Sequence, residues 1–295
     1  AREKELGRLV ELRTRDLKER TRELEKAHHN LRQSKEIIET KNRHIMDSMR
    51  YAHKIQQSML PMKEKMAKEL QEYFVIYKPK DIVSGDFYWF DIIESHYFLA
   101  LADCTGHGVP GALLSMMGYM MLNEVVNERH IFDPAMILAR LHQGFRYALK
   151  QEMEETDTYD GMDIGLCRID LPTGKVTFAG ARRPLFYVKN SKLIEIKGDR
   201  KSIGGRQKEV KHVFTNHEIG IENEIMIYLT SDGFADQHDP LNQKYGSRRL
   251  KEFLQSFAHL SADQQEDVLL KELARHQVNE EQRDDITILG IRLRV

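Results

Sequence analysis

Acidic residues stand at four points where a predicted apolar strand begins or ends. Aspartate is common in turns, so turn formation alone explains any one of these sites. Four such sites are harder to explain in this way, because a carboxylate at the rim of an apolar core is costly unless it is paired or bound to a metal. We therefore expect these acids to share one pocket. They are Asp86, Asp103, Asp232 and the adjacent Asp284 and Asp285.

A pocket lined by these carboxylates would suit hard divalent cations. Mg²⁺ and Mn²⁺ prefer oxygen ligands, whereas zinc more often binds His or Cys. Two such cations roughly 3.5 to 4 Å apart can activate a water molecule and hold a phosphoryl group for in-line attack. The acids therefore predict a two-cation site for phosphoryl chemistry.

The chain beyond about residue 70 alternates strand-like runs with helical stretches. Short turns at 172–174 and 190–191 join neighbouring runs, which makes those strands antiparallel. Hairpins interrupted by helices predict an α+β domain with helices on the sheet faces. Strands are expected at 73–77, 87–92, 97–102, 162–169, 175–179, 185–189, 193–196, 224–230 and 286–293, and helices at 110–128, 134–152, 247–257 and 262–276.

The first 60 residues have a different composition, so we divide the chain into regions 1–60 and 61–295. The first region contains no proline, and an apolar residue recurs at every seventh position from Val10 to Met59. Seven residues is the coiled-coil period. The second seam position of each heptad is mainly polar, so we expect a weak parallel homodimer through residues 1–60, with a single solvated helix as the alternative. Such a seam could change register at low energetic cost.

The overall composition excludes several classes of protein. With 45 basic and 46 acidic residues, no net field attracts nucleic acid or an anionic membrane, and we expect neither contact from this chain. Two cysteines cannot form a disulfide framework, which favours the cytoplasm. The longest apolar stretch, 109–122, is too short to span a bilayer. The chain begins with Ala, so an upstream sensor or membrane domain could precede it.

Four segments resemble, in order, the motifs of PPM-type (type 2C) protein phosphatases, particularly the bacterial branch of stage II sporulation protein E and the sigma-factor regulatory phosphatases. The resemblance covers residues 50–295. It implies a four-layer sandwich of two antiparallel sheets flanked by helices, two Mn²⁺ or Mg²⁺ ions, and hydrolysis of phosphoserine or phosphothreonine by metal-bound water. The segments are Ile82-Val83-Ser84-Gly85-Asp86-Phe87-Tyr88, Ala102-Asp103-Cys104-Thr105-Gly106-His107-Gly108-Val109-Pro110-Gly111-Ala112, Thr230-Ser231-Asp232-Gly233 and Arg283-Asp284-Asp285-Ile286-Thr287.

The resemblance also implies a role for each acid. Asp103 would bridge both ions, and the main-chain carbonyl of Cys104 would bind one of them. Asp232 and Asp284 would complete the shell of the second ion. Asp86 would act on the first ion, directly or through a water molecule.

Some assignments remain open at the level of sequence. Asp285 stands where many relatives have Asn, and we place Asp284 narrowly ahead of it as the direct ligand. Arg182 and Arg183 are candidates for binding the substrate phosphate, although a solvated loop explains them equally well. His107 is either a general acid or, in the simpler interpretation, a structural turn residue.

These observations predict a metal-dependent protein serine/threonine phosphatase in the cytoplasm, or in the cytoplasmic part of a larger membrane or sensor protein. Regulation would pass through the N-terminal coiled coil in bacterial signalling. The substrate would be a phosphoprotein, and a phosphorylated anti-sigma-factor antagonist is typical of the branch. The alternatives are a nucleotidyl or diguanylate cyclase, which lacks an evident nucleotide-binding motif here, and a non-catalytic coiled-coil adaptor, against which the complete acidic motifs argue.

Overall fold

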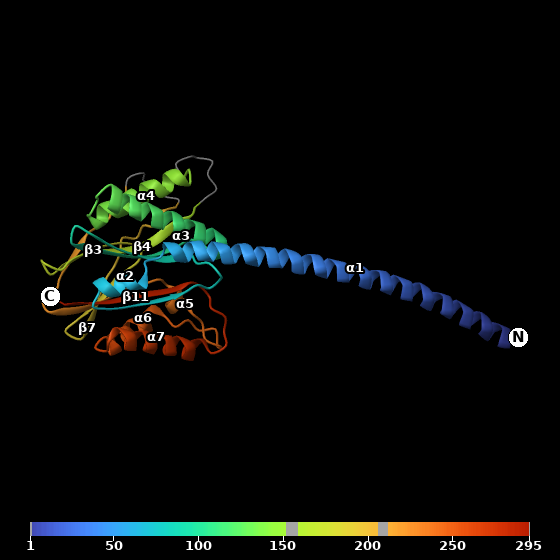
Figure 1. Cartoon of the computed structure of the whole chain (residues 1–295). Helices are drawn as coiled ribbons and strands as arrows, with labels where there is room; N and C mark the ends of the chain where they lie inside the picture. Colours follow the sequence, from blue (N-terminus) through green and yellow to red (C-terminus); the bar gives the residue numbers. More distant parts are fainter. Residues whose placement is uncertain (1, 152–158, 206–211, 295) are drawn as a thin grey trace. The chain divides into compact units, whose positions relative to one another are not determined.

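The computed structural model describes residues 2–151, 159–205 and 212–294 (Figure 1). The chain divides into two compact units, residues 1–51 and 52–295. One helix, α1 (Arg2–Met59), forms the first unit and contributes residues 52–59 to the second. The predicted helix in the N-terminal region is therefore confirmed.

The first unit exposes the apolar stripe that the heptads predict. Leu17, Leu24 and Leu31 are 62%, 71% and 69% exposed. Ion pairs one turn apart, such as Arg20 with Asp16, add only a few tenths of a kcal/mol each to a helix. The stripe is thus free to pack on a second helix, and the homodimer remains a prediction.

Two antiparallel sheets form the centre of the second unit, as predicted. The turns at 172–174 and 190–191 join antiparallel partners in the structure. The first sheet has the order β1 (Glu72–Lys78), β11 (Ile286–Arg294), β10 (Glu224–Thr230), β6 (Leu185–Lys189) and β7 (Lys192–Ile196). The second has the order β2 (Asp86–Ile93), β3 (His96–Cys104), β4 (Gly161–Asp170), β5 (Lys175–Ala181) and β9 (His217–Gly220), with β8 (Ile203–Gly204) beside β4.

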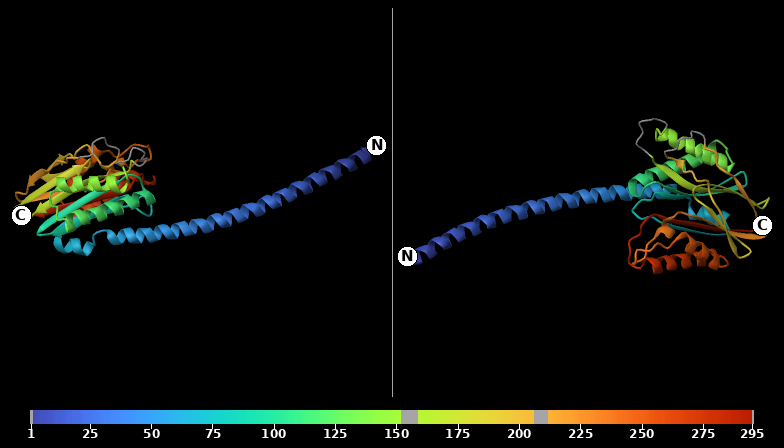
Figure 2. Two further views of the ribbon diagram at one scale, coloured as in Figure 1. Left: turned by 90° about the horizontal axis from the view of Figure 1, so that it is seen from above. Right: turned by 180° about the vertical axis from the view of Figure 1, so that it is seen from behind.

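Helices cover the outer face of each sheet, which completes four layers (Figures 1 and 2). On the second sheet, side chains such as Leu122 and Leu141 pack against Trp89. On the first sheet, Leu254 and Leu269 pack against Tyr228. The helices are α2 (Lys63–Glu69), α3 (Gly108–Asn123) with the π-helical turn η1 (Glu124–Glu128), α4 (Pro134–Ala148), α5 (Gly233–Asp236), α6 (Ser247–Phe257) and α7 (Ala262–Gln277).

Two predicted helices differ in detail from the structure. The stretch predicted at 110–128 is α3 followed by η1, and together they are long and apolar enough to cross a membrane by length and composition. Leu122, Val125 and Val126 are buried in the core, which is typical of a helix packed within a protein. The helix predicted at 134–152 ends at Ala148, and residue 152 lies outside the described residues.

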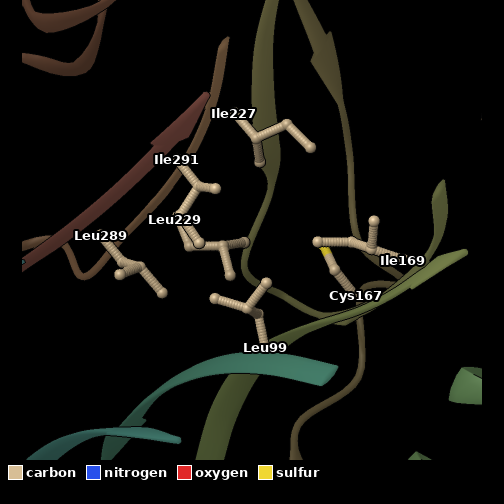
Figure 3. A pocket seen from close by; sticks show the side chains of 7 residues that line it. All are labelled: Leu99, Cys167, Ile169, Ile227, Leu229, Leu289 and Ile291. Carbon is tan, nitrogen blue, oxygen red and sulfur yellow. The ribbon is translucent and has the colours of Figure 1, made fainter. Parts of the chain in front are cut away.

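The space between the two sheets is filled by apolar side chains. Figure 3 shows seven of them around a small void. Its volume is about 10 Å³, which is at the lower limit for one water molecule. The lining is wholly apolar, so this void is a packing gap and not a ligand site. It is lined by Leu99, Cys167, Ile169, Ile227, Leu229, Leu289 and Ile291.

Candidate active site

Three neighbouring strands of the second sheet each carry an aspartate at the same end of that sheet. The strand register pairs Asp86 on β2 with Asp103 on β3, and Asp103 with Asp163 on β4. Residues directly opposite on antiparallel strands have Cβ atoms about 4.5 to 5.5 Å apart on the same face. The strand pairing therefore places three carboxyl groups in a row.

The first sheet brings two further acids to this end of the sandwich. Asp232 follows β10, and Asp284 precedes β11, which is the antiparallel neighbour of β10. The end of one antiparallel strand lies beside the start of the next, so the two carboxyl groups meet at one edge. Acids from both sheets thus converge, although Asp103 and Asp284 are 181 positions apart in the sequence.

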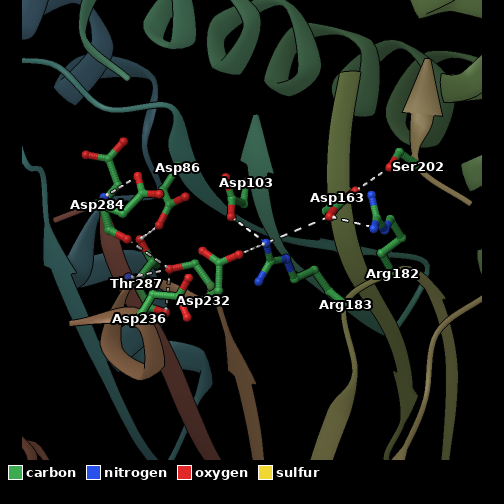
Figure 4. Close-up of polar contacts among 12 residues, drawn as sticks. Asp86, Asp103, Asp163, Arg182, Arg183, Ser202, Asp232, Asp236, Asp284 and Thr287 are labelled. Atoms are coloured by element: carbon green, nitrogen blue, oxygen red, sulfur yellow. Dashed lines mark hydrogen bonds and ion pairs between the residues drawn. The ribbon is translucent and has the colours of Figure 1, made fainter. Parts of the chain in front are cut away.

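An open pocket of about 240 Å³ lies between these acids (Figure 4). Asp103, Asp163, Asp232 and Asp284 line it together with the segment 104–107. The predicted convergence of Asp103, Asp232 and Asp284 is therefore seen in the structure. Figure 4 shows these side chains approaching one another from strands of both sheets.

Arg183, a candidate for binding the substrate phosphate, lies among the carboxylates and not in a solvated loop. Its Nη2 donates to Asp103 Oδ2 at 2.6 Å and to Asp232 Oδ2 at 2.8 Å. The same nitrogen is 3.8 Å from Asp163 Oδ2, and the side chain is 12% exposed. Arg183 is therefore the positive charge that holds the two halves of the site together.

The pocket is short of positive charge even with this arginine. Burial raises the pKa of Asp103 to about 7, an increase that Arg183 opposes and that Asp232 strengthens. Burial and the neighbouring Asp103 raise the pKa of Asp86 well above its usual range. Burial also raises the pKa of Asp284. Since nearby cations lower such values, the site is suited to additional positive charge.

The chemistry of the donors fits Mg²⁺ or Mn²⁺. Carboxylate oxygens and a main-chain carbonyl are the ligands that these cations prefer. Within the described residues, no group of three or more His, Cys, Asp or Glu side chains is spaced to hold a metal ion. The guanidinium of Arg183 accounts for this spacing, because it stands between Asp103 and Asp232.

Asp284 and Asp285 have different surroundings. Asp284 lines the pocket, whereas Asp285 is 4% exposed and does not. The two carboxylate oxygens of Asp285 accept hydrogen bonds from the main-chain N–H groups of Lys80 and Gly85, both at 2.7 Å. The Asp285 carboxylate therefore holds the loop that precedes β2, and its predicted place among the metal ligands stays a prediction.

Asp86 is also placed differently from a pocket-lining ligand. It is 1% exposed, and its Oδ2 accepts a hydrogen bond from the Thr287 hydroxyl at 2.7 Å. It therefore lies buried beside Asp103 and does not line the pocket. Its predicted action on the first ion, directly or through a water molecule, stays a prediction.

The main chain approaches the site closely where glycine permits it. A Cβ on Gly85 would lie 2.6 Å from the Gly106 carbonyl oxygen and 3.2 Å from that of Cys104. Gly106 itself has φ of +82°, a conformation that glycine adopts without strain. The Cys104 thiol is buried, which raises its pKa well above the usual value. The thiol is therefore no nucleophile, and the turn presents its main chain to the pocket.

Comparison with known proteins decides the family. Residues 94–294 match the family model described as Stage II sporulation protein E (SpoIIE). The structure aligns with the SiaA-PP2C domain of Pseudomonas aeruginosa at 33% identity and a TM-score of 0.77, over 85% of this chain and 98% of that chain. The chain belongs to the SpoIIE family of PP2C-type serine/threonine phosphatases.

More distant members of this phosphatase fold support the same architecture. The SpoIIE phosphatase domain with a regulatory fragment from Bacillus subtilis is 17% identical, with a TM-score of 0.59 over 75% of this chain and 62% of that one. RsbX, solved in complex with magnesium, is 14% identical, with a TM-score of 0.51 over 75% and 94%. At these identities the likeness shows the fold alone. No curated protein matches the chain.

Asp163 was absent from our predicted site in this SpoIIE-family domain. It lies in the pocket wall, where its Oδ1 accepts a hydrogen bond from the Ser202 hydroxyl at 2.6 Å. Arg182 Nε is 3.9 Å from its Oδ2. The signal was present in the sequence, since Asp163 is an acid near the start of the apolar run 162–169. Asp163 was missed among the acids that flank the predicted strands, because this residue lies inside the strand predicted at 162–169.

His107 lies on the rim of the pocket. Its Nδ1 is 2.7 Å from Asp81 Oδ2, and both side chains are exposed. The pair joins the turn after β3 to the loop before β2. This contact favours the simpler interpretation, in which His107 is a structural residue of the turn.

We predict that Arg183→Met strengthens the binding of Mn²⁺ to the metal-free protein. The guanidinium occupies oxygens that the cations need, and hydrogen bonds to charged groups contribute about 1.5 to 3 kcal/mol each. We expect Kd to fall roughly tenfold. Isothermal titration with Mn²⁺ measures this, with the exposed Arg182→Met as the control. An unchanged or higher Kd for Arg183→Met would show that the arginine supports the bound state.

Binding of Mn²⁺ should also release protons in a pH-dependent way. Asp103 has a pKa of about 7 without metal, so at pH 6 it is mostly protonated and must lose its proton when it becomes a ligand. Above pH 8 this carboxyl is already ionised and contributes no proton. Calorimetry at each pH in buffers of different ionisation enthalpy counts the protons. Asp103→Asn should abolish the proton release that comes from Asp103. If the wild type released equal numbers of protons at pH 6 and above pH 8, Asp103 would not be the group that loses a proton.

Proposed function

We propose that this chain hydrolyses phosphoserine or phosphothreonine in a phosphoprotein, with two Mn²⁺ or Mg²⁺ ions as cofactors. The observation that carries this proposal is the convergence of acids from two sheets on one open pocket. The raised pKa of Asp103 supports it, because carboxylates that are buried side by side are suited to binding cations. Membership of a PP2C-type family supports the same reaction.

The residues present divide the work of holding such ions. Asp103 lies between the acids of both sheets and is the candidate bridging ligand. Asp232 and Asp284 would hold one ion, and the Cys104 carbonyl with the buried charge of Asp86 would serve the other. Bound cations of this kind supply a nucleophilic water and neutralise the phosphoryl charge.

The two arginines of the pocket wall are assigned to the substrate phosphate. A guanidinium presents a planar pair of donors that matches phosphate oxygens. Arg182 reaches the pocket from an exposed position on its rim. Arg183 could take the same role only when it is not bonded to Asp103 and Asp232.

Hydrolysis of p-nitrophenyl phosphate tests the proposed reaction. We expect activity with Mn²⁺ or Mg²⁺ and none after chelation, and Asp232→Asn should lower kcat/KM by about 100-fold or more. Asp267→Asn is the control, because that acid is exposed on α7 and pairs only with Lys271 among the described residues. A flat response to both metals would favour the non-catalytic adaptor, and formation of a cyclic nucleotide from a triphosphate would favour the cyclase.

We also propose that the N-terminal helix regulates this activity as a parallel homodimer through residues 1–60. The exposed leucine stripe of the first unit supports the dimer. A location in the cytoplasm, or on the cytoplasmic side of a larger sensor protein, suits a signalling phosphatase. A phosphorylated anti-sigma-factor antagonist is the substrate class that the family suggests.

Gln56 is the residue of α1 that could carry the signal. It is 3% exposed within the catalytic unit. Its side-chain amide donates to the Ser84 carbonyl at 2.6 Å and to the Ser115 hydroxyl at 2.9 Å, and its carbonyl accepts from the Ser84 N–H at 3.0 Å. Ser84 in turn accepts a hydrogen bond from the N–H of Asp86. A rotation of residues 52–59 would therefore move the loop beside the acids.

We predict that Gln56→Leu raises the Mn²⁺ concentration needed for half-maximal activity by about tenfold. The change leaves the main-chain N–H of Ser84 without its buried partner, which costs about 1 to 3 kcal/mol. The neighbouring Gln57 is exposed, so Gln57→Leu is the matched control. Metal titrations of both variants give the comparison. If the two variants behaved alike, the helix would not hold the loop.

A further inference from the structure

A groove of about 570 Å³ adjoins the catalytic pocket. Arg182 lines both hollows, so they share a wall. Lys197 and Arg200, from the segment after β7, form the far side of the groove together with Glu195 and Asp199. A peptide with one residue bound in the pocket would therefore reach the groove if it extended past Arg182.

The uncompensated charge of this groove is positive. Lys197 and Arg200 are exposed, and their side chains form no ion pair or hydrogen bond with the described part of the chain. Of the two acids, Glu195 is paired with Lys251, whereas Asp199 keeps its charge and accepts hydrogen bonds from a neutral residue. Glu195 accepts a hydrogen bond from Lys251 at 3.0 Å, and Asp199 accepts from the N–H and the hydroxyl of Thr215 at 2.7 and 3.2 Å.

The main chain fixes the groove to the catalytic pocket. The N–H of Arg182 donates to the Asp199 carbonyl, and the N–H of Asp199 donates to the Gly180 carbonyl, both at 2.8 Å. Gly198 lies so close to this turn that a Cβ there would be 2.6 Å from the Arg183 carbonyl oxygen. The main chain that carries Lys197 and Arg200 therefore keeps a fixed position relative to Arg182 and Arg183.

We propose that this groove binds acidic residues that flank the phosphorylated serine or threonine of a protein substrate. The inference rests on the proposed phosphatase function and adds the sequence context of its substrate. Arg182 would stand between the phosphate in the pocket and the acidic flank in the groove. The acids of the pocket repel acidic residues of the substrate. The basic groove would therefore bind the acidic residues that flank the phosphorylated residue.

Charge and size favour an acidic peptide over a nucleic acid. The groove offers three basic side chains and two engaged acids, which suits one or two carboxylates better than a continuous polyanion. Its lining contains no aromatic residue on which a base could stack. The chain as a whole has a net charge of −1, which gives no long-range attraction for nucleic acid.

Two phosphopeptides test the proposal on the full chain with Mn²⁺. They carry the same phosphoserine, flanked by Asp and Glu in one and by Ala in the other, and p-nitrophenyl phosphate serves as a substrate without a flank. The test variant is Lys197→Glu with Arg200→Glu. The control is Lys192→Glu with Arg248→Glu, which changes the net charge equally at two exposed positions outside the groove.

We expect the wild type to cleave the acidic peptide with a kcat/KM about three- to tenfold higher than the neutral one, since exposed charge pairs have modest effects. High salt should reduce this ratio. The test variant should lose the preference and keep its activity on p-nitrophenyl phosphate within about twofold, as should Lys197→Ala with Arg200→Ala. The control pair should behave like the wild type.

Three results would overturn the proposal. The wild type could show no preference, the test variant could keep it, or both groove variants could lose activity on p-nitrophenyl phosphate, which would make the groove part of the catalytic centre. Stronger competition by an oligonucleotide than by the acidic peptide would assign the groove to nucleic acid instead. Absence of any metal-dependent hydrolysis is a separate outcome, because it refutes the phosphatase function itself.

Discussion

Repulsion among buried carboxylates is the constraint on which the catalytic end of this protein depends. Asp103, Asp163, Asp232 and Asp284 line one pocket, and Arg183 supplies two hydrogen bonds to them. One buried guanidinium does not balance four acids, so burial and mutual repulsion raise the pKa of Asp103 to about 7. A site in this condition favours divalent cations strongly, because each cation relieves repulsion that the folded chain cannot avoid.

The rest of the fold keeps the acids together against this repulsion. An apolar core between the sheets aligns the ends of β3, β10 and β11. The loop before β2 is fixed separately, by Asp285 from one side and by Gln56 from the other. Both contacts are buried hydrogen bonds to main-chain groups, which are costly to leave unmade. A shift of the loop therefore breaks one of these contacts, and one of them comes from the end of α1.

The two adjoining hollows carry opposite charges. The pocket gathers acids for cations, and the neighbouring groove presents Lys197 and Arg200, with Arg182 at the junction. Hydrogen bonds between the turn at 180–183 and Asp199 keep the two hollows in register. Under the proposed function, the pocket would hold the phosphate and the groove the acidic flank, so catalysis and selection among substrates would depend on different residues.

Local signals in the sequence, apolar periodicity and acids at strand ends, predicted the N-terminal helix, three of the pocket acids and the strands other than β8 and β9. The run predicted at 97–102 is β3, His96–Cys104, and the acid that follows the run lines the pocket. The different surroundings of Asp284 and Asp285 appear only in the tertiary structure, because the Lys80 and Gly85 N–H groups that bond Asp285 are about 200 positions away in the sequence. The tertiary structure also decided the place of Asp163 and the partners of Arg183, because these depend on which strands lie side by side, and strand pairing is set by packing across the whole core.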